Sequence, residues 1–166
     1  MATATYIPIA TQTLGSAASS ITFSSIPGTY TDLRLVLTCT TSALDYVSFQ
    51  YNGITTTTYS CIELYGNGAT AASNYETGAN MISIDAGGTI GSSTTIPELY
   101  TIDVFSYAGA TNKTSLHAAS MDHNGSGEVI SSVGLWRSTA PITSIKLLGA
   151  AASNFNAGTI ATLWGI

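Results

Sequence analysis

Residues 127–166 read GEVISSVGLWRSTAPITSIKLLGAAASNFNAGTIATLWGI, and this stretch decides the fold class. Its side chains alternate with a period of two residues, which is typical of β-strands. In the first run, Val129, Val133 and Leu135 fall on one face of the predicted strand. Ile130 and Trp136 fall on the other face together with Ser132 and Gly134. Both faces therefore carry apolar side chains.

Two further strands follow in the same stretch. Pro141 has no N–H to donate, so we expect it just before the second strand, which covers 142–148. Gly149 to Gly158 is rich in small residues and predicts a loop, with Phe155 holding that loop to the core. Residues 159–166 predict a third strand, whose terminus we expect to be paired and partly buried.

The same alternation recurs through the rest of the chain. It predicts strands at 3–14, 21–24, 31–40, 45–51, 55–65, 81–84, 98–107 and 113–121. Asn52-Gly53 and Asn67-Gly68 are typical of tight hairpin turns, while 69–80 is small and polar and predicts a loop, with one helical turn at 71–76 as an alternative. Asp85 to Thr95 has the composition of a flexible segment.

The inward face is predicted most clearly in two early strands. In 31–40, Leu33, Leu35, Leu37 and Cys39 share one face. In 45–51, the expected inward residues are Val47, Phe49 and Tyr51, and the expected outward residues are Tyr46, Ser48 and Gln50. About eight to ten strands with no clear helix favour an antiparallel, jelly-roll-like β-sandwich forming one domain over residues 1–166.

The composition is apolar but poor in charge. Hydrophobic residues make up 45% of the chain and charged residues only 8%, with a formal net charge of −5. A neutral, hydrogen-bonding surface associates with other proteins without desolvating many charges, which favours self-association. The four basic residues are scattered, which argues against nucleic-acid binding: Arg34, Lys113, Arg137 and Lys146. No apolar run approaches the roughly 20 residues of a membrane span, and a signal-peptide pattern is absent, so we expect synthesis in a cytoplasm.

The loop Asp122 to Glu128 is the strongest candidate for chemistry. Oxygen-bearing side chains recur at Asp122, Asn124, Ser126 and Glu128, as at the start of a calcium-binding loop. The twelfth position is Val133, where such a loop needs a bidentate Glu. A hairpin loop is the better interpretation, and we expect no metal site.

Catalytic groups are also not apparent. His117 and His123 lie near Asp122 in sequence, but no third ligand is evident, so we expect surface histidines near a hairpin tip. Asp103 and Asp122 would be the paired carboxylates of a glycosidase only if the fold brought them together. The Gly-x-Ser-x-Gly pattern of a hydrolase does not occur. We therefore expect no enzyme activity, no catalytic residue and no cofactor.

The remaining side chains of interest are aromatic residues, cysteines and glycosylation sequons. Among the aromatic side chains, Tyr59, Tyr65 and Tyr75 lie nearest the predicted loops, where exposed rings would suit a glycan or a protein interface. Cys39 and Cys61 are expected to be buried thiols without a disulfide. The sequons at Asn112 and Asn124 are attributed to chance in a Ser- and Thr-rich chain.

Three segments carry a resemblance to a known family. GLWRSTAPITSI (134–145), TIATLWGI (159–166) and TLGSAASSITFSSIPGTYTDLRLVL (13–37) resemble small virion structural proteins of tailed bacteriophages. The resemblance covers both ends of the chain and is loose in the middle. It implies a jelly-roll-like fold, trimers and a place in the virion, and it brings no catalytic motif.

The resemblance leaves two positions in the particle open. The first is capsid decoration, in which the protein forms a homo-oligomer, expected to be a trimer, on the major capsid protein. The second is a tail fibre or receptor-binding tip that recognises a cell-surface glycan.

Overall fold

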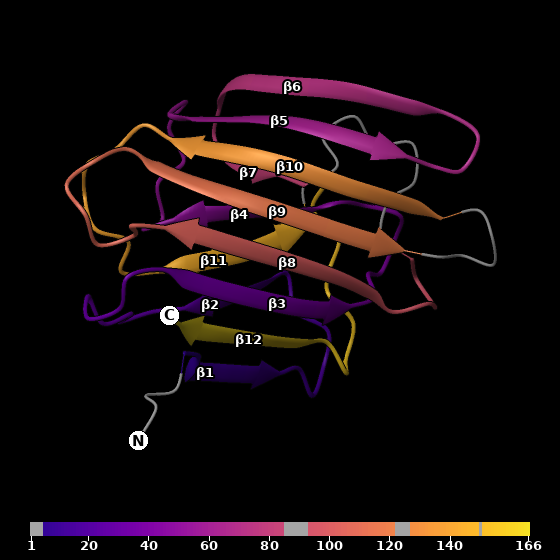
Figure 1. The fold of residues 1–166 in the computed structure, drawn as a ribbon. Coiled ribbons are helices and arrows are strands. Elements are labelled where there is room, and N and C mark those ends of the chain that lie inside the picture. Colours follow the sequence, from indigo (N-terminus) through magenta and orange to yellow (C-terminus); the bar gives the residue numbers. More distant parts are fainter. Residues whose placement is uncertain (1–4, 85–92, 122–126, 150) are drawn as a thin grey trace.

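The computed structural model describes residues 5–84, 93–121, 127–149 and 151–166. Within these ranges the chain forms two antiparallel sheets that pack face to face as a β-sandwich (Figure 1). The larger sheet contains, in spatial order, β1 (Ile7–Thr13), β12 (Ile160–Gly165), β3 (Leu33–Cys39), β8 (Glu98–Phe105), β9 (Lys113–Met121), β10 (Glu128–Trp136), β5 (Tyr59–Gly66) and β6 (Ala71–Ala79). The smaller sheet contains β2 (Ser20–Phe23), β11 (Ile145–Gly149), β4 (Val47–Tyr51) and β7 (Ile82–Ser83).

The core lies between the two sheets and is built by the predicted alternation. On β3, Leu33, Leu35, Leu37 and Cys39 are all buried, which confirms the inward face expected there. On β10 the buried row runs from Glu128 through Ile130, Ser132 and Gly134 to Trp136. The apolar row that contains Val129 and Val133 therefore lies on the outside of the sandwich.

The C-terminal stretch is central to the larger sheet. β12 lies between β1 and β3 and pairs with both. The backbone of Ile166 exchanges hydrogen bonds with Asp32, and its carbonyl also accepts one from the N–H of Thr31, so the expected pairing of this terminus is confirmed. Phe155 is fully buried and bridges both Ala18 and Thr41, which holds its loop to the core as predicted.

The two Asn-Gly turns have different roles. Asn67-Gly68 closes the β5–β6 hairpin, and Gly68 has a φ of 83°. Asn52 and Gly53 also have positive φ angles, of 53° and 66°. However, this turn carries the chain from β4 in the smaller sheet to β5 in the larger one. The local geometry was predicted correctly, whereas the hairpin pairing on either side of Asn52-Gly53 was wrong.

Two other predictions are corrected by the structure. Residues 69–80 contain the nine-residue strand β6 and not a loop or helical turn, because pairing with β5 satisfies the backbone of these small polar residues. All five residues of β4 are buried, so the outward assignment of Ser48 and Gln50 was wrong. Their polar groups are satisfied within the fold: Ser48 bonds to the hydroxyl of Ser83, and Gln50 donates to the carbonyl of Asn80.

Candidate interaction surface

The outer face of the larger sheet carries exposed apolar side chains from five adjacent strands. Because side chains alternate across a strand, every second residue of these strands points away from the core. The apolar members, between 43% and 73% exposed, are Ile62, Leu64, Tyr75, Leu99, Phe105, Leu116, Val129 and Val133. We call this set the outer face. Exposed apolar side chains gathered on one sheet face are typical of an interaction surface.

Register places four of these side chains in one line across the sheet. Tyr75 on β6 pairs with Ile62 on β5, and Ile62 pairs with Val133 on β10. Val133 in turn pairs with Leu116 on β9. Directly opposed residues in antiparallel strands hold their Cβ atoms about 4.5–5.5 Å apart, so these side chains are immediate neighbours. We call this row of four residues the apolar stripe.

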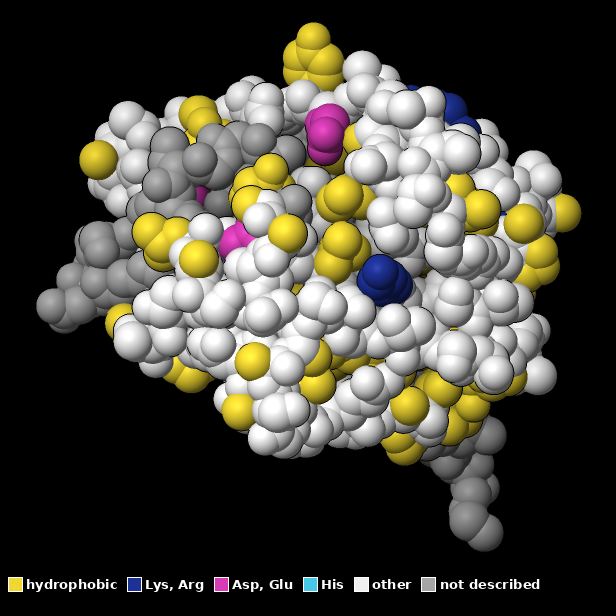
Figure 2. Space-filling view, turned by 180° about the vertical axis from the view of Figure 1, so that it is seen from behind, with side chains coloured by type: hydrophobic (Ala, Val, Ile, Leu, Met, Phe, Trp, Pro, Cys, Tyr) yellow, Lys and Arg dark blue, Asp and Glu magenta, His cyan; other side chains and the backbone are white. Residues whose placement is uncertain are grey.

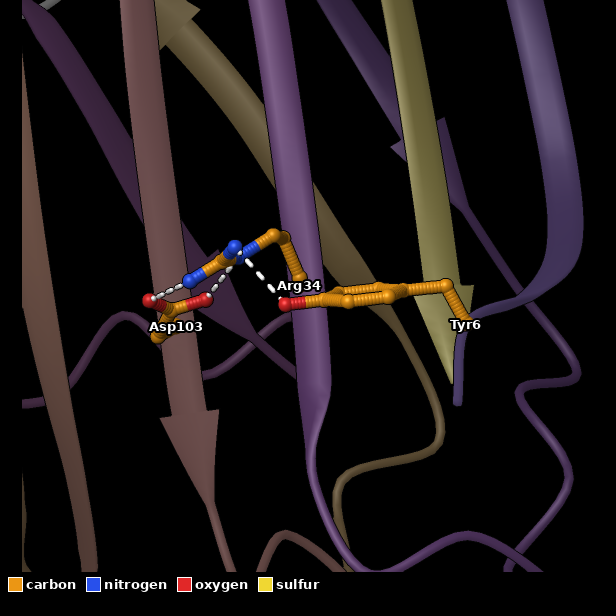
Figure 3. A network of polar contacts seen from close by, with 3 residues as sticks. All are labelled: Tyr6, Arg34 and Asp103. Atoms are coloured by element: carbon orange, nitrogen blue, oxygen red, sulfur yellow. Dashed lines mark hydrogen bonds and ion pairs between the residues drawn. The ribbon is translucent and has the colours of Figure 1, made fainter. Parts of the chain in front are cut away.

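A polar network ends the apolar stripe. Leu116 pairs with Asp103 on β8, and Asp103 pairs with Arg34 on β3. The guanidinium of Arg34 donates two hydrogen bonds to the carboxylate of Asp103, both of 2.6 Å, and one of 2.9 Å to the Tyr6 hydroxyl (Figure 3). The hydrogen bond to Asp103 raises the pKa of Arg34 despite partial burial. The charges of Asp103 and Arg34 are thus paired with each other on the outer face.

A shallow hollow lies beside the apolar stripe. It measures about 590 Å³ and is lined by residues of β5, β6 and β10, including Leu64, Gly66, Ser73 and Val129. Gly66 contributes no side chain beside Val129, its partner on β10, which leaves the surface open there. On the other side of the molecule, over the four-stranded sheet, hydrophobic side chains are scattered, and both basic and acidic side chains are visible among them (Figure 2).

His117 is buried in the core, so the prediction of a surface histidine was wrong. Only 1% of its surface is exposed. Its Nδ1 lies 2.8 Å from the Ser132 hydroxyl and its Nε2 lies 2.7 Å from the Ser115 hydroxyl. The ring packs edge-on against Phe49, with centroids 5.1 Å apart. Burial lowers the pKa of His117 to about 3, so the imidazole is neutral and serves as a satisfied polar core group.

The loop that resembles the start of a calcium-binding loop, and that we expected to be a hairpin loop, is only partly described by the structure. Asp122, His123, Asn124 and Ser126 lie outside the described residues, and so does the second sequon. Glu128 is described and is buried at the start of β10, and burial raises the pKa of its carboxyl group. Among the described residues, no group of three or more His, Cys, Asp or Glu side chains is placed to hold a metal ion.

The three tyrosines expected near the loops have different environments. Tyr75 is 73% exposed, as predicted, and Tyr65 is partly buried. Tyr59 is fully buried, which contradicts the prediction, because its ring stacks on Trp136 and its hydroxyl bonds to backbone groups of Tyr51 and Ile54.

The cysteines and basic residues lie at separate places in the fold. Cys39 and Cys61 are buried and free, as predicted. Lys113 is buried and donates to the carbonyls of Gly109 and Thr111, so it caps a turn. In the described ranges, no helix is long and apolar enough to cross a membrane.

The sequence reasoning missed the outer face as a site. It placed Val129, Val133 and Leu135 on one face of a strand, but both faces of that strand are apolar, so the pattern did not indicate which face is uncovered.

Comparison of the chain with models of known protein families and with curated proteins finds no match.

Proposed function

We propose that this protein is a structural protein of a bacteriophage particle, and specifically a capsid decoration (cement) protein. In this role it packs as a homo-oligomer, a trimer in the resembling family, on the major capsid protein. The resemblance also implies that the strands of the sandwich are connected as in a jelly roll, and we include this topology in the proposal. The role is structural and involves no substrate turnover, no cofactor and no nucleic acid.

The outer face is the observation that carries this proposal. Five strands present eight apolar side chains there, and the charges of Arg34 and Asp103 at its border are paired with each other. Covering a half-exposed aliphatic side chain contributes about 1 kcal/mol, from the usual 25 cal/mol per Å² of apolar area. Many such modest contacts, repeated over a lattice of identical sites, give strong attachment through multivalency. The resemblance of both chain ends to virion proteins supports the same role.

The test uses particles that lack this protein. Purified protein is added back, and bound protein is measured by co-sedimentation while particle stability is followed by thermal release of DNA. We expect the wild-type protein to bind and to raise the temperature of DNA release. Val133→Lys places a charge in the apolar stripe and is expected to weaken binding about tenfold or more.

Ser24→Lys is the matched control, since Ser24 is exposed directly after β2 of the smaller sheet. It adds the same charge away from the outer face and should bind like the wild type. Decoration is refuted if wild-type protein does not bind the particles, or if both variants bind equally well.

The second candidate is a tail-tip protein that recognises a cell-surface glycan. The exposed ring of Tyr75 lines a second hollow on the outer face, together with Ile62 and Val133. This arrangement favours glycan binding, because aromatic faces stack on sugar rings. Particles that assemble and keep their heat stability without this protein, yet fail to adsorb to cells, would favour this role over decoration. Loss of adsorption with Tyr75→Ala would then locate the glycan contact.

A further inference from the structure

The two sheets have four edge strands, and three of them carry features that prevent strand addition. β1 contains Pro8 and has a register irregularity between Pro8 and Ala10. β2 has four residues and β7 has two, so each offers little backbone to a new strand. Proline, bulges and short length are the usual means by which proteins protect sheet edges.

The fourth edge, β6, is long and contains no proline, and its one register irregularity lies near its end. It has nine residues, contains no Pro, Lys or Arg, and is the outermost strand of the larger sheet (Figure 1). Its register with β5 is regular from Ala71 to Thr77, before an irregularity at Gly78, whose φ is 65°. Ala71, Ala72, Ser73 and Thr77 are exposed. Among the described residues, β5 is the only strand paired with β6.

We propose that β6 of one copy pairs antiparallel with β6 of a second copy, about a two-fold axis at Asn74. Both larger sheets then join into one continuous sheet with their outer faces on the same side. Seven paired residues give a contact about 24 Å long, at the usual rise of about 3.4 Å per residue. This proposal specifies one contact between copies in the homo-oligomer proposed above. It rests on that part of the proposed function alone.

An axis at Asn74 pairs all seven residues of the regular part of β6, Ala71 to Thr77, and side-chain charge disfavours a competing register. With the axis at Asn74, Glu76 of each copy faces Ala72 of the other, so the two carboxylates are kept apart. An axis at Glu76 would oppose two like charges, which is unfavourable. With the axis at Asn74, Tyr75 faces Ser73 of the other copy and lies diagonal to the other Tyr75, within reach of an aromatic ring. The apolar stripes of the two copies thereby meet.

A second copy fits this edge better than a foreign strand for two reasons. An isologous contact satisfies both exposed edges at once, because the same surface serves on both copies. The side chains on β6 are small or uncharged apart from Glu76, so self-pairing brings no charge clash. A closed trimer uses heterologous contacts. The β6–β6 contact is therefore separate from the contacts within a trimer. It joins two single copies, or two trimers, to each other.

The first test measures the molar mass of the purified chain by light scattering after size-exclusion chromatography. We expect an even number of chains. Asn74→Lys places two ammonium groups opposite each other on the axis and is expected to halve the molar mass, from dimer to monomer or from hexamer to trimer. Far-UV circular dichroism checks that the variant is folded.

The second test is cross-linking, which does not depend on the behaviour of Asn74→Lys. Under mild oxidation, Asn74→Cys is expected to form a disulfide between copies, since opposed Cα atoms in a sheet lie within the 4.4–6.8 Å range that disulfides require. Thr77→Cys is the matched control: it lies on the same strand, three residues from the axis, and should not cross-link. Cys39 and Cys61 are buried and contribute little background.

The proposal is overturned by a wild-type monomer at 100 μM or more, by a mass that Asn74→Lys leaves unchanged, or by equal cross-linking of both cysteine variants. It is also overturned if β6 cross-links only to a protein of another sequence in assembled particles. Failure of the virion role is a separate result, because it appears as absence from particles while the mass and cross-linking measurements keep their expected values.

Discussion

The buried imidazole of His117 predicts a loss of stability in mild acid. Its pKa falls from 6.5 to about 3 because burial disfavours the charged form, an effect that the nearby Asp103 carboxylate only partly offsets. Below pH 6.5 the unfolded chain binds a proton at His117 that the folded protein does not bind. Stability is therefore fully present above pH 6.5 and falls progressively between pH 6.5 and about pH 3.

The size of the effect follows from this difference in proton binding. One pKa unit corresponds to about 1.4 kcal/mol, and at pH 5 the unfolded imidazole is almost fully protonated. Moving from pH 8 to pH 5 should therefore lower the free energy of unfolding by about 2 kcal/mol through His117 alone. The value changes little if the folded pKa is one unit higher, because the folded histidine is still neutral at pH 5.

The assay is urea unfolding of the wild type and of His117→Gln at pH 8 and pH 5. A glutamine amide can donate to one of the Ser115 and Ser132 hydroxyls and accept from the other, but it does not titrate. The change in stability of the variant between pH 8 and pH 5 should be smaller than that of the wild type by about 2 kcal/mol. Carboxyl groups titrate in both proteins and cancel in this comparison. Equal changes in the two proteins would refute the buried, neutral histidine.

Three further predictions concern the fold. Gly134→Ala should lower stability by about 1–3 kcal/mol in chemical unfolding, because a Cβ there would lie 2.8 Å from the His117 ring; an unchanged midpoint would contradict this packing. Asp45→Ala should cost about 3 kcal/mol in thermal unfolding, since its buried carboxylate accepts four hydrogen bonds from nearby donors, whereas Asp45→Asn should cost less. Cys39 and Cys61 should react with a thiol reagent at pH 8 only after unfolding, since burial raises both pKa values, that of Cys61 to about 12; fast labelling of the folded protein would disprove their burial.

The accuracy of the sequence predictions depended on whether a feature is local. The strand at 31–40 was predicted with the correct inward face, because only one of its faces is fully apolar. The segment 69–80 was predicted wrongly, because small polar residues have no strong strand preference and β6 forms through its partner β5. Asn52-Gly53 adopts the predicted backbone angles but connects two sheets, since a turn fixes the direction of the chain over a few residues only.

The candidate surface also depends on contacts that are not local in sequence. Alternation placed Val129 and Val133 on one face of a strand and Ile130 and Trp136 on the other, without indicating which face is covered. His117 was likewise assigned to the surface because it lies near a predicted hairpin tip. The alternation along its strand does not show which face points toward the core. In the structure, β9 and β10 lie in the middle of the larger sheet, so the row containing His117 and Trp136 faces the smaller sheet.

The sequence by itself determined the all-β class, most of the strands, the turn at Asn67-Gly68 and the burial of both cysteines. These features depend on a period of two residues and on backbone preferences that neighbouring residues fix. Only the tertiary structure decided which strands share a sheet, which apolar row is buried and which edge lacks protection. Those choices depend on contacts between residues far apart in sequence, and each apolar face is buried or exposed according to whether another layer covers it.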